Sequence, residues 1–91
     1  MIICKVIGNV WATRKKEALS GEKLMVVQRM GLDDKPADEI FVAVDCVGAG
    51  IGEQVLVTTG SSARMALRNH EAPVDAAIVG IIDEVQAAGA R

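Results

Sequence analysis

The chain has 91 residues, a length typical of one small domain, which is expected to span residues 1–91. Apolar residues make up 51% of the sequence, and Val, Ile and Ala dominate them, whereas Trp11 and Phe41 are the only aromatic residues. A domain of this size buries a limited share of its surface in its own core. Part of the apolar surface is therefore expected to face another copy of the chain. The composition is typical of a soluble, β-rich protein that forms oligomers.

Charge and apolar patterning exclude several classes of protein. The 10 basic and 12 acidic side chains leave a net charge of −2, which argues against a protein that binds nucleic acid through its phosphates. No apolar run approaches the ~20 residues that span a bilayer, so no membrane segment is expected. The N-terminal residues lack the basic region and cleavage site of a secretory signal. Cys4 and Cys46 lack metal or disulfide spacing, which indicates two buried thiols in a reducing cytosol.

Runs of β-branched residues predict five strands. In chain order, they are expected over Ile2–Val10, Lys23–Met30, Ile40–Val47, Val55–Thr59 and Ala76–Ile82. Gly8 inside the first strand indicates a bulge or a bend. The last strand is almost wholly apolar, so both of its faces should be covered, either by the wall of a barrel or by a neighbouring subunit.

Polar residues, Gly and Pro predict the connections between these strands. A charged excursion is expected over Thr13–Gly21, an exposed tip over Gly31–Glu39, a glycine-rich turn over Gly48–Glu53, a polar loop over Arg68–Pro73 and a small-residue tail over Gln86–Arg91. Ser61 or Ser62 is expected to cap a short helix over Ala63–Leu67. Five evenly spaced strands and one short helix predict an all-β fold, a small closed or partly open five-stranded barrel.

The sequence contains no arrangement that favours catalysis or cofactor binding. The segment G-A-G-I-G at Gly48–Gly52 lacks the spacing of a dinucleotide-binding loop, and a strand rather than a helix follows it, so a tight turn or a constriction between subunits fits better. His70 has no partners at the spacing of a zinc site. Ser61 and Ser62 lack the surroundings of a nucleophilic serine. We therefore expect that the protein is not an enzyme and that it binds neither a cofactor nor a metal ion.

Four charged residues are candidates for structural contacts. Asp45 lies in an apolar strand and must be paired, with backbone N–H groups or with an arginine. Arg64 could bind an anion through its planar guanidinium, but an intersubunit salt bridge is favoured, with Asp45, Glu53 or Asp75 as the acid. The basic run Arg14–Lys16 is typical of a solvated surface, or of a contact with an acidic neighbour.

Three blocks of the sequence together resemble one family, the pentameric vertex proteins of bacterial microcompartments, of the EutN/CcmL type. The first block is Lys5–Val27, which contains Gly8, Leu19-x-Gly21 and Lys23-Leu24-Met25. The second block is Val42–Leu56, which contains the motif D-x-V-G-A-G-x-G-E. The third block consists of Gly60–Arg64, with the sequence G-S-S-A-R, and of Pro73–Asp83. The likeness runs from residue 1 to about residue 85. The chain differs from many relatives in its Gly31–Glu39 hairpin and in its short C-terminal tail.

The resemblance implies a barrel of the oligonucleotide-binding type, assembled as a homopentameric ring without catalytic activity. Such a ring closes the corners of a polyhedral shell in the bacterial cytoplasm, whose faces consist of hexameric and pseudohexameric shell proteins. It also implies a narrow axial pore, for which the candidate residues are Gly48, Ala49, Gly50, Ile51 and Gly52, or Ser61, Ser62 and Ala63. The sequences of the G-S-S-A-R motif and of the G-A-G-I-G-E turn favour a metabolosome over a carboxysome as the enclosed compartment. A small barrel that binds a ligand or single-stranded nucleic acid is the alternative, which two aromatic residues and a negative charge disfavour.

Overall fold

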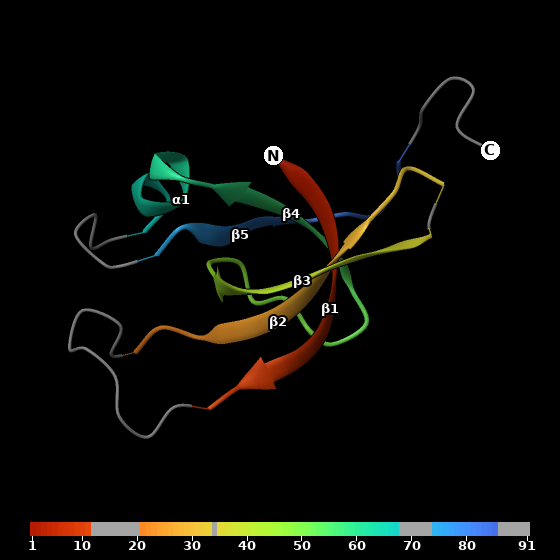
Figure 1. The fold of residues 1–91 in the computed structure, drawn as a ribbon. Helices are drawn as coiled ribbons and strands as arrows, with labels where there is room; N and C mark the ends of the chain where they lie inside the picture. Colours follow the sequence, from red (N-terminus) through yellow and green to blue (C-terminus); the bar gives the residue numbers. More distant parts are fainter. Residues whose placement is uncertain (12–20, 34, 68–73, 86–91) are drawn as a thin grey trace.

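The computed structural model describes residues 1–11, 21–33, 35–67 and 74–85. Its elements are β1 (Ile2–Val10), β2 (Leu24–Met30), β3 (Pro36–Asp45), β4 (Gln54–Thr59), α1 (Ser61–Met65) and β5 (Ala76–Ile81) (Figure 1). The strands close a barrel in the order β1-β2-β3-β5-β4. Neighbouring strands are antiparallel except β3 and β5, which are parallel. The expected all-β, five-stranded barrel is confirmed, and it is closed.

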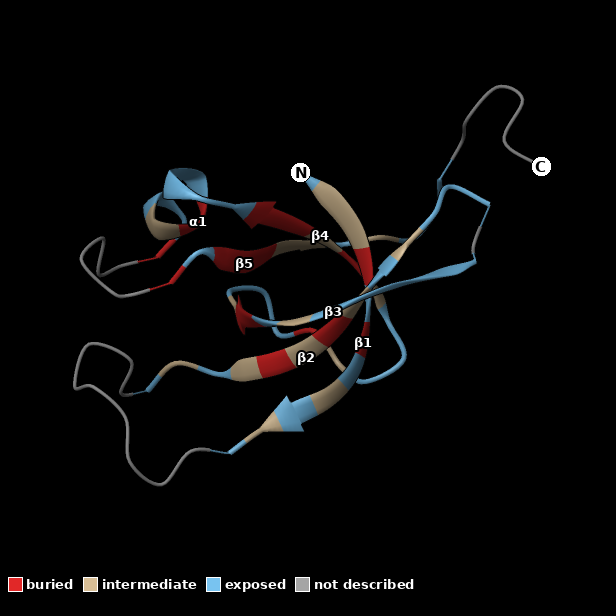
Figure 2. Cartoon of the chain, viewed as in Figure 1, coloured by how far each residue is buried: buried red, intermediate tan, exposed pale blue. Residues whose placement is uncertain are grey.

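Buried stretches of the strands lie next to exposed and half-buried ones (Figure 2). This alternation places small and β-branched side chains inside the barrel. In β1, for example, Cys4 and Val6 are buried while Lys5 between them is exposed. The buried core consists of Cys4, Val6, Met25, Val27, Ala43, Ala49, Val55, Val57, Ala76 and Ile78. A five-stranded barrel has a narrow interior that side chains of this size fill. The narrow interior accounts for the abundance of Val and Ala and for the scarcity of aromatic residues.

The β2–β3 hairpin differs from its sequence-based prediction. The described residues of Gly31–Glu39 are exposed, as expected. The loop itself is shorter, because β3 begins at Pro36, which pairs with Met30 of β2. The Gly31 N–H closes the tip by donating to the Lys35 carbonyl at 2.9 Å. Proline is tolerated as the first residue of a strand, where no ladder N–H is needed. The strand expected over Ile40–Val47 therefore runs over Pro36–Asp45.

The predicted cap of the helix is wrong. Ser61 and Ser62 are the first residues of α1, and Gly60 occupies the N-cap position with φ 67° and no side-chain hydrogen bond. The Gly60 carbonyl accepts the Ala63 N–H at 3.1 Å. Glycine adopts this positive φ without steric cost, so the chain turns from β4 into the helix one or two residues earlier than predicted.

The predictions for β1 and β5 have different outcomes. The register of β1 against β2 shifts between Val6 and Gly8, as expected for a bulge. In β5, the residues Ala76–Ile78 are buried, but Val79 and Gly80 are half-buried and Ile81 is 38% exposed. Within one subunit, β5 is thus covered along its first half only, and cover of the second half by a neighbouring copy stays a prediction.

Several sequence-based predictions lie outside the described residues. They concern the excursion before Gly21 with Arg14–Lys16, the loop with His70, and the tail beyond Val85. In the part of the chain that the structure describes, no helix is both long enough and apolar enough to cross a bilayer.

Candidate functional site

A buried carboxylate organises the turn that leads into the glycine-rich loop. The Asp45 side chain is 1% exposed, and its Oδ1 accepts the N–H groups of Val47 and Gly48 at 3.0 Å each. Its Oδ2 lies 3.6 Å from Nζ of Lys23, and the same ammonium donates to the Ala49 carbonyl at 3.3 Å. The expectation that Asp45 is held by backbone N–H groups is confirmed. Its basic partner is Lys23 rather than an arginine.

The far end of the loop is held in a similar way. Oε1 of Glu53 accepts the Gly50 N–H at 2.7 Å. The Gly52 N–H donates to the Val6 carbonyl at 2.8 Å, and the Val6 N–H donates to the Glu53 carbonyl at 3.0 Å. Gly48 and Gly52 have φ values of +81° and +94°, a backbone region that favours glycine. The carboxylates of Asp45 and Glu53 therefore each stabilise one end of the loop.

The second candidate for the axial loop lies at the start of α1. Ser61 and Ser62 are exposed, whereas Ala63 is fully buried against the barrel. The Gly60 N–H donates to the Asp75 carbonyl at 2.9 Å and ties the start of the helix to the residue before β5. Backbone hydrogen bonds thus hold both candidate loops. Ala49 and Ala63 are fully buried in the subunit, so the expectation that they border the pore is wrong for these two residues.

Arg64 on α1 is half-buried, and no carboxylate of the described residues lies within ion-pair distance of it. Of the three acids expected to pair with it, Asp45 binds Lys23 and Glu53 binds the backbone of its own loop. Asp75 is exposed. The described part of a single chain therefore does not provide the salt bridge that the sequence suggests for Arg64.

The two thiols lie in different surroundings. Cys4 is fully buried, and burial is the main reason that its pKa rises to about 11. Cys46 is exposed, so the prediction of two buried thiols is wrong for this residue. The reason is that β3 ends at Asp45 and leaves Cys46 in the turn. Partial burial, followed by the nearby carboxylates of Glu22 and Asp45, raises the pKa of Cys46.

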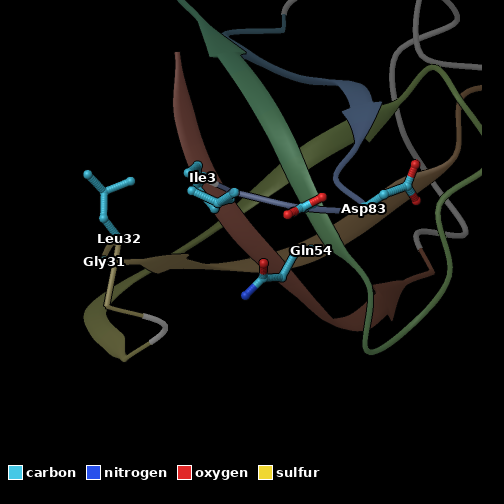
Figure 3. A pocket seen from close by; sticks show the side chains of 7 residues that line it. Ile3, Gly31, Leu32, Gln54 and Asp83 are labelled. Carbon is cyan, nitrogen blue, oxygen red and sulfur yellow. The ribbon is translucent and has the colours of Figure 1, made fainter. Parts of the chain in front are cut away.

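A cleft of about 340 Å³ separates the β2–β3 hairpin tip from the segment after β5 (Figure 3). Its walls combine apolar and acidic side chains: Ile3, Gly31, Leu32, Gln54, Asp83, Glu84 and Val85. Among the described residues, no group of three or more His, Cys, Asp and Glu side chains is arranged to hold a metal ion.

Sequence reasoning missed two features of these surfaces. Lys23 was assigned to a strand and not to the site, although the register that pairs Leu24 with Val44 brings it beside Asp45. The exposed apolar residues Ile40 and Val42 of β3 were not recognised as a surface. The alternation of β3 could have indicated the second feature, but the first depends on the pairing of strands.

Comparisons with known proteins agree with this architecture. The family model described as "Ethanolamine utilisation protein EutN/carboxysome" matches residues 1–83. The bacterial microcompartment shell vertex protein GrpN of Rhodospirillum rubrum is 49% identical over 86 residues, which cover 94% of this chain and 97% of that protein. The carboxysome shell vertex protein CcmL of a Synechocystis species is 46% identical over 88 residues, which cover 97% of this chain and 88% of that protein. The solved structure titled "GrpN pentameric microcompartment shell protein from Rhodospirillum rubrum" superimposes with a TM-score of 0.89 at 48% identity, covering 96% of this chain and 99% of that one.

These relatives define one class, the structural shell proteins of bacterial microcompartments and carboxysomes. The chain belongs to the EutN/CcmL family. It is a bacterial microcompartment shell vertex protein, of the kind that forms pentameric vertices. The resemblance carried by the three sequence blocks is thereby confirmed.

Proposed function

We propose that five copies of this chain form a ring that closes a corner of the shell next to hexameric and pseudohexameric proteins on its flat faces. The observation that carries this proposal is the fold shared with the pentameric GrpN structure over 96% of the chain at 48% identity. A flat hexagonal lattice cannot close into a polyhedron without pentagons. A cyclic ring of five identical subunits is the simplest protein assembly that supplies a pentagon.

The role that we propose is structural rather than catalytic. The two carboxylates of the glycine-rich loop accept backbone N–H groups, and so hold the loop in place. Carboxylate oxygens that accept backbone N–H groups hold a turn in one conformation. Asp45 and Glu53 therefore support a rigid loop of constant shape, which suits a narrow axial opening.

The axial pore is proposed to be bordered either by Gly48 and Gly50–Gly52 or by Ser61 and Ser62. Ile51 is 62% exposed at the tip of the first loop, and Ser62 is exposed on the second. Near a fivefold axis, equivalent residues of the five copies approach one another closely. Ile51→Cys and Ser62→Cys, each made with Cys46→Ala, therefore distinguish the loops, because a short bismaleimide links neighbouring copies efficiently only through the residue beside the axis.

Native mass spectrometry of the purified protein tests the assembly. The expected result is a complex of five copies at micromolar concentration. Co-expression with hexameric shell proteins tests the role, since closed polyhedra are expected with this chain and open sheets or tubes without it. A stable monomer at micromolar concentration contradicts the proposed ring. Closed polyhedra without the chain contradict its role at the corners.

A further inference from the structure

Most of β3 has a strand partner on one side only. β2 pairs with it from Pro36 to Val44. In the described part of the chain, β5 pairs with it only at Val44 and Asp45. As far as the described residues show, residues 36–43 of β3 therefore form an open edge in an otherwise closed barrel. Such an edge presents backbone N–H and C=O groups with which another chain can pair.

A groove follows this open edge. Its larger part, of about 460 Å³, lies between Phe41 and Val42 of β3 and the start of β5, with Ile2 of β1 in its wall. A smaller hollow of about 220 Å³ continues it, and the two share Val42, Asp75 and Ala76. We call this surface, defined by Ile2, Glu39, Phe41, Val42, Asp75 and Ala76, the β3-edge groove.

The apolar part of the edge lacks the usual protection against association. Natural edge strands are protected by proline and charged residues, which β3 carries at its start with Pro36, Asp38 and Glu39. Its continuation over Ile40–Val44 carries no charge, and Ile40 and Val42 are 55% and 46% exposed. Two large apolar side chains beside unpaired backbone groups are typical of a surface that is covered in the assembled protein.

We propose that the neighbouring copy of this chain in the ring covers the β3-edge groove. The inference rests on the proposed pentamer, because a fivefold ring joins two different surfaces of each copy. It is supported by the pentameric structure of the 48% identical relative. Contacts within a permanent ring are more apolar than transient ones, and the groove combines apolar walls with an open strand edge. The exposed carboxylate of Asp75 at its rim favours a basic side chain on the neighbour.

The test places a charge in the groove and a matched charge elsewhere. Val42→Asp puts a carboxylate beside Asp75, whereas Leu32→Asp changes a 59% exposed residue at the hairpin tip. The oligomeric state is measured by native mass spectrometry over a range of concentrations, and circular dichroism checks the fold. We expect Val42→Asp to need at least tenfold higher concentration for half-assembly than the wild type, and Leu32→Asp to assemble like the wild type.

The outcomes separate this inference from the proposed function. Pentamers of Val42→Asp with an unchanged concentration dependence overturn the inference, while the pentameric vertex stands. Intact Val42→Asp rings that no longer join a shell also overturn it, because the groove then faces a different shell protein. A monomeric wild type overturns the proposed ring itself.

Hydrogen exchange of the wild type decides the question if Val42→Asp does not fold. The amides of residues 40–43 are compared between assembled rings and subunits dissociated by dilution. Slower exchange in the ring supports the inference, because the neighbour then covers the edge. Equal exchange in both states contradicts it.

Discussion

At the scale of single residues, Asp45 determines how the chain leaves β3. Its carboxylate is nearly inaccessible, receives two backbone N–H groups and lies beside the Lys23 ammonium. A side chain that binds N–H groups two and three residues ahead competes with the strand ladder and starts a turn. The same residue thereby ends β3 at Asp45, places Cys46 at the surface and holds the first half of the glycine-rich loop.

The first prediction concerns the removal of this carboxylate. Asp45→Ala removes the hydrogen bonds that the exposed N–H groups of Val47 and Gly48 donate. Water can replace the acceptor in part, so each lost bond costs about 0.5–1.5 kcal/mol. We expect the free energy of unfolding to fall by about 1–3 kcal/mol in urea titrations. Asp83→Ala, at an exposed carboxylate, should change it by less than about 0.5 kcal/mol. Equal effects of the two substitutions would contradict the structural role of Asp45.

The second prediction concerns the pH dependence of stability through Cys4. Burial raises its pKa from 9.0 to about 11, so the folded chain keeps the thiol protonated where the unfolded chain ionises it. The resulting contribution to stability is complete below pH 9 and is lost between about pH 9 and 11. Urea titrations at pH 8 and pH 10.5 measure this loss, which should be smaller in Cys4→Val.

Thiol accessibility provides an independent check of the same surroundings. At pH 8, iodoacetamide should modify Cys46 in the dissociated native subunit and spare Cys4, because only Cys46 is exposed. Both should react in urea. Mass spectrometry of the digested protein locates the label, and equal labelling of Cys4 in the native subunit would show that it is not buried.

At the scale of elements, the connections determine where strands begin and end. Gly60 turns β4 into α1, Asp45 ends β3, and Gly52 joins the loop to the backbone of Val6 in β1. These joints rely on backbone conformations and hydrogen bonds, while the strands rely on the alternation of buried residues. Substitutions at the joints should therefore act through the backbone rather than through the core.

The third prediction compares two glycines. Gly52 has φ +94°, and a Cβ there would meet no atom within 4 Å, so Gly52→Ala tests the backbone alone. We expect the free energy of unfolding to fall by about 1–2 kcal/mol, the cost of a left-handed conformation. Gly80 in β5 has no positive φ, and a Cβ there would lie 3.7 Å from Leu56 in ordinary contact. Gly80→Ala should be neutral, and a loss equal to that of Gly52→Ala would contradict the proposed strain.

At the scale of the whole molecule, the isolated subunit has apolar side chains exposed at two places and a half-buried arginine without an acidic partner. β3 exposes Ile40 and Val42, the second half of β5 exposes Ile81, and Arg64 has no carboxylate nearby among the described residues. Small domains bury a limited share of their surface, and a ring can bury the remainder between copies. The exposed groups of the subunit are therefore consistent with the proposed ring, in which neighbouring copies would cover them.

The fourth prediction tests Arg64 as a contact between copies. If its guanidinium binds a carboxylate or backbone carbonyls of the next copy, Arg64→Ala leaves that partner unpaired, which costs about 3–5 kcal/mol for a buried pair and less where water enters. The ring should weaken more than the subunit. Dissociation on dilution, followed by native mass spectrometry, measures the ring, and circular dichroism measures the fold. Identical dissociation curves would remove Arg64 from the interface and leave the family assignment intact.

The sequence by itself determined the family, the barrel and most strand positions. The strand at Ile2–Val10 was predicted with its observed bounds and its bulge near Gly8, because alternation and glycine act within a few residues. The pairing of Asp45 with backbone N–H groups was also predictable, since a charge in an apolar strand must be satisfied. These features depend on local chemistry.

Only the tertiary structure decided which distant residues meet. Lys23 reaches Asp45 through the β2–β3 register. Among the described residues, β3 lacks a second strand partner before Val44, because β5 joins it only at its end. The turn into α1 is also tied to a distant segment, because the Gly60 N–H donates to the Asp75 carbonyl. Closure of a barrel fixes registers between strands far apart in the chain, and no local pattern specifies those registers. The open edge that we assign to the ring therefore became visible only once the strands were paired.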